Sequence, residues 1–76
     1  MEALAASGDL PAALLSHREY DVLCLLGSGR TVKEISAELD LSPKTVSTYR
    51  ARLLEKMRLT GNADLVRYAA RHGLIR

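Results

Sequence analysis

The link between two helix-like segments constrains this chain more than any other feature of its sequence. Residues 32–39 and 43–57 both have the periodicity of amphipathic helices, and only Asp40, Leu41 and Ser42 separate them. So short a link cannot let two helices run antiparallel with long faces in contact, so it holds them at a steep angle. Asp40 stands at the turn, where Asp tolerates a left-handed backbone. The sequence therefore predicts a helix-turn-helix.

Start and stop signals predict two more helices, one on each side of this pair. Ser16, followed three residues later by Glu19, has the capping-box spacing and predicts a helix over 17–27. A last helix over 63–72 is expected to end at Gly73, a residue suited to a left-handed C-cap. The start signals of the central pair are Thr31 with Glu34 and Ser42 with Pro43. Because no strand-like alternation of useful length is present, the expected class is all-α, a four-helix bundle containing the helix-turn-helix.

Length and composition limit the chain to one small domain. With 76 residues and no Trp or Phe, its core must come from Leu, Ile, Val, Ala, Met and three Tyr. Residues 1–15 combine Ala-rich runs with a Gly and a Pro, and we expect them to be a linker from an upstream domain. The helix-turn-helix domain would then occupy residues 16–76, with Leu74 and Ile75 folded back on the core.

Charge is distributed unevenly along the chain, although the net charge is only +2. Residues 1–29 carry four Asp or Glu against one Arg, a net charge of −3. Residues 30–76 carry ten Lys or Arg against five Asp or Glu, a net charge of +5. A basic C-terminal half is typical of a protein that binds a polyanion.

Residues for other kinds of chemistry are missing from the sequence. Cys24 is the only cysteine, so no internal disulfide is possible, and its apolar surroundings predict a buried thiol. His17 and His72 have no partners at metal-ligand spacing, so neither a metal nor a cofactor is expected. No nucleophile with its base and no Gly-rich phosphate loop is visible, which argues against an enzyme. No apolar stretch approaches the roughly 20 residues of a membrane span, and no signal peptide is recognisable, so the expected location is the cytoplasm.

The segment 43–57 has two different faces when its residues are placed around a helix. The apolar side holds Val46, Tyr49, Leu53, Leu54 and Met57, with Arg50 among them. The other side holds Lys44, Ser47, Thr48, Ala51, Arg52 and Glu55. The corner between the two central helices should be filled by Ile35, Leu39, Leu41 and Val46. A small, polar and basic outer face suits a helix that enters the major groove of DNA, and the alternative is an ordinary solvated face.

Four motifs in this order and at these spacings resemble the LuxR/NarL-type helix-turn-helix domain over about residues 15–75. They are Ser16-His17-Arg18-Glu19 with Val22-Leu23; Lys33-Glu34-Ile35-Ser36; Ser42-Pro43-Lys44-Thr45-Val46; and Leu53-Leu54-Glu55-Lys56-Met57 before Leu59. The resemblance implies a four-helix domain that binds DNA sequence-specifically as a homodimer on two half-sites and regulates promoters. In members of this family the DNA-binding domain usually lies C-terminal to a phosphorylated receiver or a ligand-binding domain. Ser47 and Ala51 replace the longer basic residues of many members, and Tyr49 replaces a common His, so fewer base contacts are expected.

Candidate contact residues follow from the outer face and from the helix starts. For base edges we predict Ser47 and Thr48, with Ala51 against a thymine methyl group. For phosphates we predict Thr31, Lys33, Lys44, Thr45 and Arg52. The alternatives are solvent exposure for the first group and a helix-capping role alone for the two threonines of the second. Lys56 and Arg58 are expected to be solvated surface.

Two further features concern packing and assembly. Glu19 and Arg50 both point with apolar residues, and we predict that they form a buried ion pair. The alternative is that Arg50 reaches solvent while Glu19 only closes its capping box. On the last helix, the core side is expected to hold Leu65, Tyr68, Ala69 and His72. The resemblance implies that this helix makes the dimer contact, which we place on the second stripe of Ala63, Val66 and Ala70.

The expected function is therefore DNA binding within a bacterial transcription regulator, with the helix over 43–57 in the major groove. The expected partners are double-stranded DNA and a second copy of the chain, with RNA polymerase as a further candidate and no membrane. The segment over residues 1–15 resembles the linkers of response regulators. By this analogy we favour the output domain of a two-component response regulator. The alternatives are region 4 of a sigma factor, and a helix-turn-helix used for contact between proteins.

Overall fold

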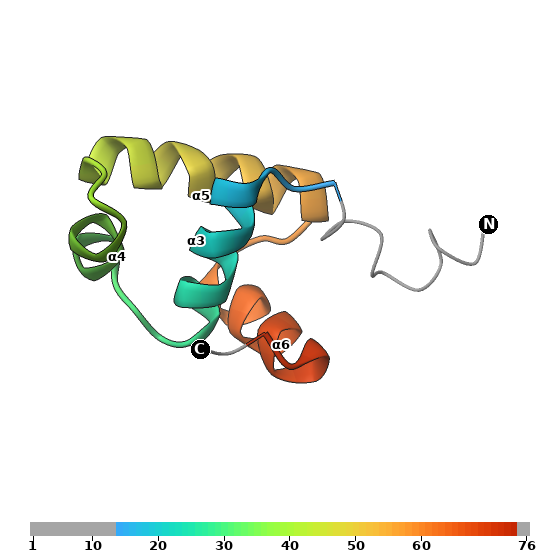
Figure 1. Cartoon of the computed structure of the whole chain (residues 1–76). Helices are drawn as coiled ribbons and strands as arrows, with labels where there is room; N and C mark the ends of the chain where they lie inside the picture. The colour runs from blue at the N-terminus through green and yellow to red at the C-terminus, as the bar shows by residue number, and fades with distance from the viewer. Residues whose placement is uncertain (1–13, 75–76) are drawn as a thin grey trace.

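The computed structural model describes residues 14–74, which form four helices and no strand (Figure 1). These are α3 (His17–Gly27), α4 (Val32–Leu39), α5 (Pro43–Met57) and α6 (Asn62–His72). The expected all-α class is confirmed, and the bounds of the first three helices are those that the sequence predicts. The last helix begins one residue earlier than expected, at Asn62. None of these helices has the length and apolar character to cross a membrane.

Side-chain caps fix where the first three helices begin. The hydroxyl oxygens of Ser16 and Thr31 accept hydrogen bonds from the backbone N–H groups of Glu19 and Glu34, and both capping boxes are complete. Ser42 caps α5 in the same way through the N–H of Thr45, with Pro43 in the first turn. These caps satisfy backbone donors that have no partner inside a helix. Because each cap needs only neighbouring residues, the sequence was sufficient to predict where these helices begin.

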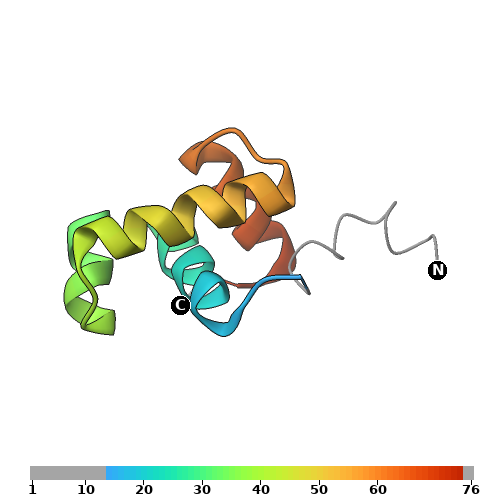
Figure 2. The same ribbon diagram turned by 90° about the horizontal axis from the view of Figure 1, so that it is seen from above.

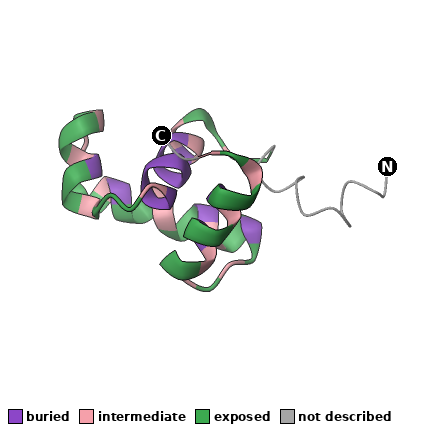
Figure 3. Cartoon of the chain, turned by 90° about the horizontal axis from the view of Figure 1, so that it is seen from below, coloured by how far each residue is buried: buried purple, intermediate pink, exposed green. Residues whose placement is uncertain are grey.

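The helix α3 lies at the centre of the domain and packs against α4, α5 and α6 (Figures 1 and 2). Its residues from Val22 to Gly27 are all buried, whereas the other helices bury one side and expose the other (Figure 3). The predicted buried thiol is confirmed, because Cys24 is 1% exposed. The core cluster of buried residues consists of Val22, Leu23, Leu25, Leu26, Ile35, Val46, Leu53, Met57 and Leu65.

The corner between α4 and α5 is filled as the sequence predicts. Ile35 and Val46 are fully buried, and Leu39 and Leu41 pack against the core from the turn. Asp40 ends α4 in the left-handed conformation, with φ 58° and ψ 47°. Together these residues hold the two helices at the angle that leaves the outer face of α5 uncovered.

Replacing Asp40 tests how much the turn depends on its left-handed backbone. Asp40→Val should lower the free energy of unfolding by about 1–2 kcal/mol, because a β-branched residue is strained at positive φ. Asp40→Asn is the matched control and should change stability little, since Asn adopts this conformation readily. Urea denaturation of both variants checks this, and equal midpoints would contradict it.

Contact between α3 and α6 is unusually close at one point. A Cβ atom added to Gly27 would lie 2.3 Å from the Cβ atom of Ala69, and Ala69 is itself fully buried. The two backbones can approach to this distance only because Gly27 has no side chain. Gly27 is therefore a packing residue as well as the last residue of α3.

Three tyrosines pack against the core, each from a different helix. Tyr20 lies on α3, Tyr49 on α5 and Tyr68 on α6, and all three are half-buried. The ring of Tyr68 lies 4.3 Å, between centroids, from that of His72. These rings add aromatic contacts to a core cluster that has no Phe or Trp.

The ends of the described segment also contribute to packing. Leu74 packs against the core, as predicted, and its N–H donates to the carbonyl of Ala69. Leu15 packs on the core at the other end, while Leu14 is 58% exposed. Of the linker expected over residues 1–15, residues 1–13 lie outside the described residues, and so does Ile75.

The predicted ion pair between Glu19 and Arg50 is wrong. The carboxylate of Glu19 is buried, but its Oε1 accepts from Lys56 Nζ at 2.8 Å and from the N–H of Ser16 at 2.9 Å. Arg50 instead donates from Nε to Asn62 Oδ1 at 2.9 Å. Lys56, which we expected to be solvated surface, supplies the cation because its long stem brings the amine to the start of α3.

Hydrogen bonds and charge also decide the protonation of Glu19. Burial raises its pKa, but the hydrogen bond from Lys56, those from Ser16 and the positive charge of Lys56 lower it more. The net pKa therefore lies below the ordinary value for glutamate, and the group is ionised at neutral pH.

Candidate nucleic-acid interface

The outer face of α5 is open to solvent over most of the length of the helix (Figure 2). Val46, Leu53 and Met57 are buried against the core, and Tyr49 and Arg50 are half-buried beside them. The residues of the predicted outer face are all exposed: Lys44, Ser47, Thr48, Ala51, Arg52 and Glu55. The division of α5 into two faces that the sequence predicts is confirmed, and the steep turn keeps α4 off the exposed face.

Hydroxyl groups in the first two turns of α5 are already partly engaged. Ser42 Oγ accepts from the N–H of Thr45 at 3.1 Å and donates to Thr45 Oγ1 at 2.9 Å. Thr45 Oγ1 therefore keeps its own proton, which it can donate to an anion. Thr48 Oγ1 donates to the carbonyl of Lys44 at 3.1 Å, so toward a base it can act as an acceptor. Ser47 and Ala51 present short side chains that allow close approach.

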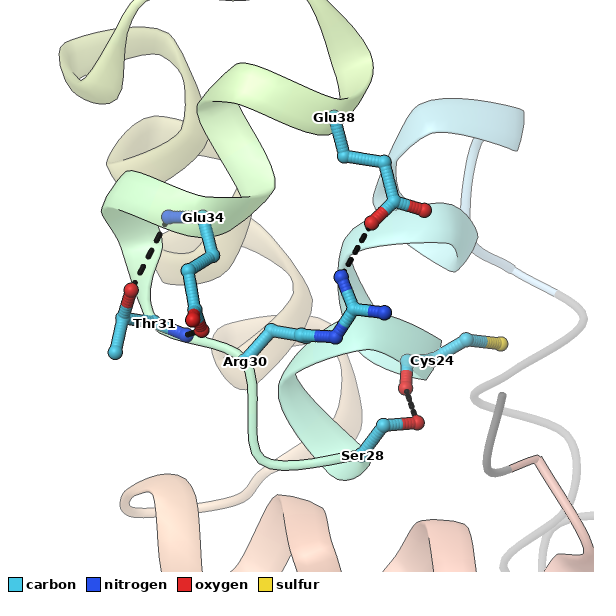
Figure 4. Close-up of polar contacts among 6 residues, drawn as sticks. All are labelled: Cys24, Ser28, Arg30, Thr31, Glu34 and Glu38. Carbon is cyan, nitrogen blue, oxygen red and sulfur yellow. Dashed lines mark hydrogen bonds and ion pairs between the residues drawn. The ribbon is translucent and has the colours of Figure 1, made fainter.

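The start of α4 carries the other two predicted phosphate residues, Thr31 and Lys33, both exposed. Thr31 Oγ1 accepts from the N–H of Glu34 at 3.1 Å, and the Glu34 carboxylate accepts from the N–H of Thr31 at 2.9 Å (Figure 4). The proton of the Thr31 hydroxyl is thus free of the capping box and can point to an acceptor outside the helix.

Nearby charges at this end of the domain are internally paired. Arg30 forms an ion pair with Glu38 of α4, and the hydroxyl of Ser28 donates to the carbonyl of Cys24 at 2.9 Å (Figure 4). Because the guanidinium of Arg30 faces a carboxylate, Lys33 is the cation of this segment that is left for an external anion. The predictions for Thr31 and Lys33 are thus compatible with the local geometry, and they stay predictions.

On the side of α5 toward α6, Arg50 and Asn62 form a contact that the sequence did not predict. The hydrogen bond between Arg50 Nε and Asn62 Oδ1 joins the middle of α5 to the first residue of α6. Periodicity placed Arg50 among the apolar residues of α5, where the structure has it half-buried, but it gave no signal for a partner twelve residues away. The ion pair of Lys56 with Glu19 was not predicted for the same reason.

The helix α6 has one buried and one exposed side. Leu65 and Ala69 are fully buried, with Tyr68 and His72 half-buried next to them, as expected from the sequence. The predicted dimer residues Ala63, Val66 and Ala70 are all exposed, and Val66 is 41% exposed. Their exposure agrees with a contact surface, and the dimer contact itself stays a prediction.

A shallow hollow of about 190 Å³ lies beside α6, lined by Leu59, Asp64, Arg67, Tyr68 and Arg71. Asp64 Oδ2 accepts from Thr60 Oγ1 at 2.7 Å and from the N–H of Thr60 at 3.1 Å. These hydrogen bonds, with the charge of Arg67, hold the pKa of Asp64 below its usual value despite the opposing effect of burial. Among residues 14–74, no group of His, Cys, Asp or Glu is arranged to hold a metal ion.

Comparison with known proteins agrees with this geometry. The sequence model of the family described as bacterial regulatory proteins, luxR family, matches residues 13–69. The chain is 45% identical over 64 residues to the response regulator UvrY of Escherichia coli (strain K12), covering 84% of this chain and 29% of that protein. It is 42% identical over 67 residues to the response regulator GacA of Pseudomonas aeruginosa, covering 88% of this chain and 31% of that protein. The chain thus spans less than a third of the length of these relatives.

Proposed function

Because the chain belongs to the luxR family of bacterial regulatory proteins, whose helix-turn-helix domains bind DNA, we propose that α5 enters the major groove of promoter DNA. The observation that carries this proposal is the exposed face of α5, which is basic and built from short side chains. We assign the base contacts to Ser47 and Thr48, with Ala51 packed against a thymine methyl group. The family consists of DNA-binding regulators, so we assign no catalytic activity to the domain.

The phosphate contacts are proposed on both helices of the motif. Lys44 and Arg52 supply charge along α5, and the Thr45 hydroxyl supplies a donor in its first turn. Thr31 and Lys33 supply the same chemistry at the start of α4. These groups would fix the register of α5 in the groove, while the base contacts select the sequence.

Selection from a random duplex library, followed by a salt titration on the enriched sequence, tests this function. We expect a motif with two half-sites, and log K should fall linearly with log salt. Lys44→Ala should reduce the slope by about one unit and weaken binding to all duplexes alike, because it removes one phosphate contact. No enrichment and no binding at low salt would refute the proposal and favour a helix-turn-helix used for contact between proteins.

We propose that two copies bind the two half-sites through Ala63, Val66 and Ala70 of α6. The stripe is small and its largest residue, Val66, is exposed, so pairing should depend on DNA holding both copies close. Val66→Glu should weaken binding to a paired site at least tenfold by placing a carboxylate in that contact, and it should leave a single half-site unaffected. Sedimentation on both duplexes checks this, and equal loss on both would contradict the assignment.

The relatives suggest to what kind of longer protein this domain belongs. UvrY and GacA are response regulators, and this chain matches less than a third of each. We therefore propose that the domain is the output part of a two-component response regulator that acts on promoters in the cytoplasm, with RNA polymerase as a further partner. The sigma-factor alternative receives no support from these relatives.

A further inference from the structure

We propose that Arg50, oriented by Asn62, contacts a DNA phosphate on the side of α5 opposite to Arg52. The inference rests on the proposed function, because it adds a contact to the same interface. No other residue has been assigned to that side of α5: Thr45 and Arg52 lie on one margin of the exposed face, and Arg50 lies on the other.

The position of Arg50 around α5 follows from helix geometry. Successive residues turn by about 100°, so Arg50 and Arg52 lie about 200° apart around the axis. Ser47 and Ala51, which face the bases in the proposed complex, lie between them on the exposed side. A helix in the major groove has a phosphate backbone on each side. Arg52 would therefore face one strand and Arg50 the other.

The partner of Arg50 leaves its charge available. Asn62 Oδ1 is a neutral acceptor, and it holds Nε at 2.9 Å. Among the described residues, no carboxylate forms an ion pair with Arg50. With Nε engaged, the terminal nitrogens remain as donors for phosphate oxygens. Because Arg50 is half-buried and already hydrogen-bonded, little side-chain entropy is lost when it binds.

The first turn of α6, which supplies Asn62, contains one carboxylate, that of Asp64. This carboxylate accepts both hydrogen bonds of Thr60 and lies 3.5 Å from Arg67 Nη1. Its charge is thus met within its own segment. Its nearest cation is Arg67, and it does not pair with Arg50.

Binding to the selected duplex tests the assignment through two charge-removing variants. Arg50→Gln should weaken binding about tenfold and lower the salt slope by about one unit, on specific and unrelated duplexes alike. Arg58→Gln, which removes the same charge at the exposed C-cap of α5, is the matched control and should change neither quantity. If the two variants behave alike, the inference is refuted while the proposed function stands. If the wild type itself does not bind DNA, the proposed function fails first.

A double-mutant cycle tests the orienting role of Asn62. Asn62→Ala removes no charge, and it should weaken binding about threefold in the wild type but not in the Arg50→Gln background. Thermal unfolding of each variant shows whether the domain stays folded. If Arg50→Gln does not fold, Asn62→Ala alone decides, and an unchanged affinity refutes the orienting role. Replacing single phosphates by neutral methylphosphonates should also reveal one position at which the wild type loses more affinity than Asn62→Ala does. The absence of such a position would count against the contact.

Discussion

Gly27→Ala should lower the free energy of unfolding by about 2–3 kcal/mol, although alanine favours a helix more than glycine does. The new Cβ atom would lie 2.3 Å from that of Ala69, a separation that forces α3 and α6 apart. Both residues are buried, and the position of a Cβ atom is fixed by the backbone, so neither methyl group can rotate away. Urea denaturation at neutral pH measures the loss.

Two further variants separate the steric effect from a general effect of the substitution. Gly61→Ala is the matched control, because no atom lies within 4 Å of the added Cβ and the backbone is extended, so its effect should stay below about 1 kcal/mol. Gly27→Ala with Ala69→Gly moves the methyl group from α6 to α3. The nearest remaining atoms then lie at 3.6 Å and 3.8 Å, and stability should return to within about 1 kcal/mol of the wild type. A double variant as unstable as Gly27→Ala would contradict the steric explanation.

Lys56→Met should lower the free energy of unfolding by about 2–3 kcal/mol at pH 7, because it leaves the buried carboxylate of Glu19 without its cation. The expected loss is at or below the low end of the range of energies for breaking a buried ion pair, because the Lys56 side chain is 41% exposed. Arg67→Met is the matched control. It breaks the more exposed pair with Asp64 and should cost much less than Lys56→Met.

The pH dependence identifies the charge as the cause. The pKa of Glu19 is lowered in the folded domain, so its ionised form contributes stability above the unfolded pKa, and this stability is lost as pH falls through the folded pKa. The difference between the wild type and Lys56→Met should therefore be complete at pH 7 and shrink below about pH 4. Thermal unfolding across this range checks the prediction, and a constant difference would mean that Lys56 contributes through packing alone.

Local signals in the sequence account for most of the fold. Helix starts are fixed by residues three positions apart, such as Thr31 and Glu34, and these interactions need no distant partner. The turn at Asp40 and the two faces of α5 are also set by neighbouring residues and by helical periodicity. This is why the helix bounds, the corner between α4 and α5 and the exposed face of α5 could all be predicted.

Contacts between distant segments could not be predicted in the same way. Periodicity gives the direction in which a side chain points around its helix, but not how far along that helix the neighbouring helix crosses. Glu19 was therefore assigned to Arg50, whereas the crossing of α3 and α5 brings it to Lys56 near the end of α5. The contact of Gly27 with Ala69 depends on a distance between helices that no local pattern encodes.

The distribution of the three tyrosines has a consequence for spectroscopy. Because the chain has no Trp, its intrinsic near-ultraviolet fluorescence comes from Tyr20, Tyr49 and Tyr68, one on each of α3, α5 and α6. Replacing two of them by Phe leaves a single emitter that reports on one chosen helix without an attached dye. If Tyr49 is the remaining emitter, its fluorescence should change when α5 binds DNA, because Tyr49 is half-buried beside the exposed face of that helix.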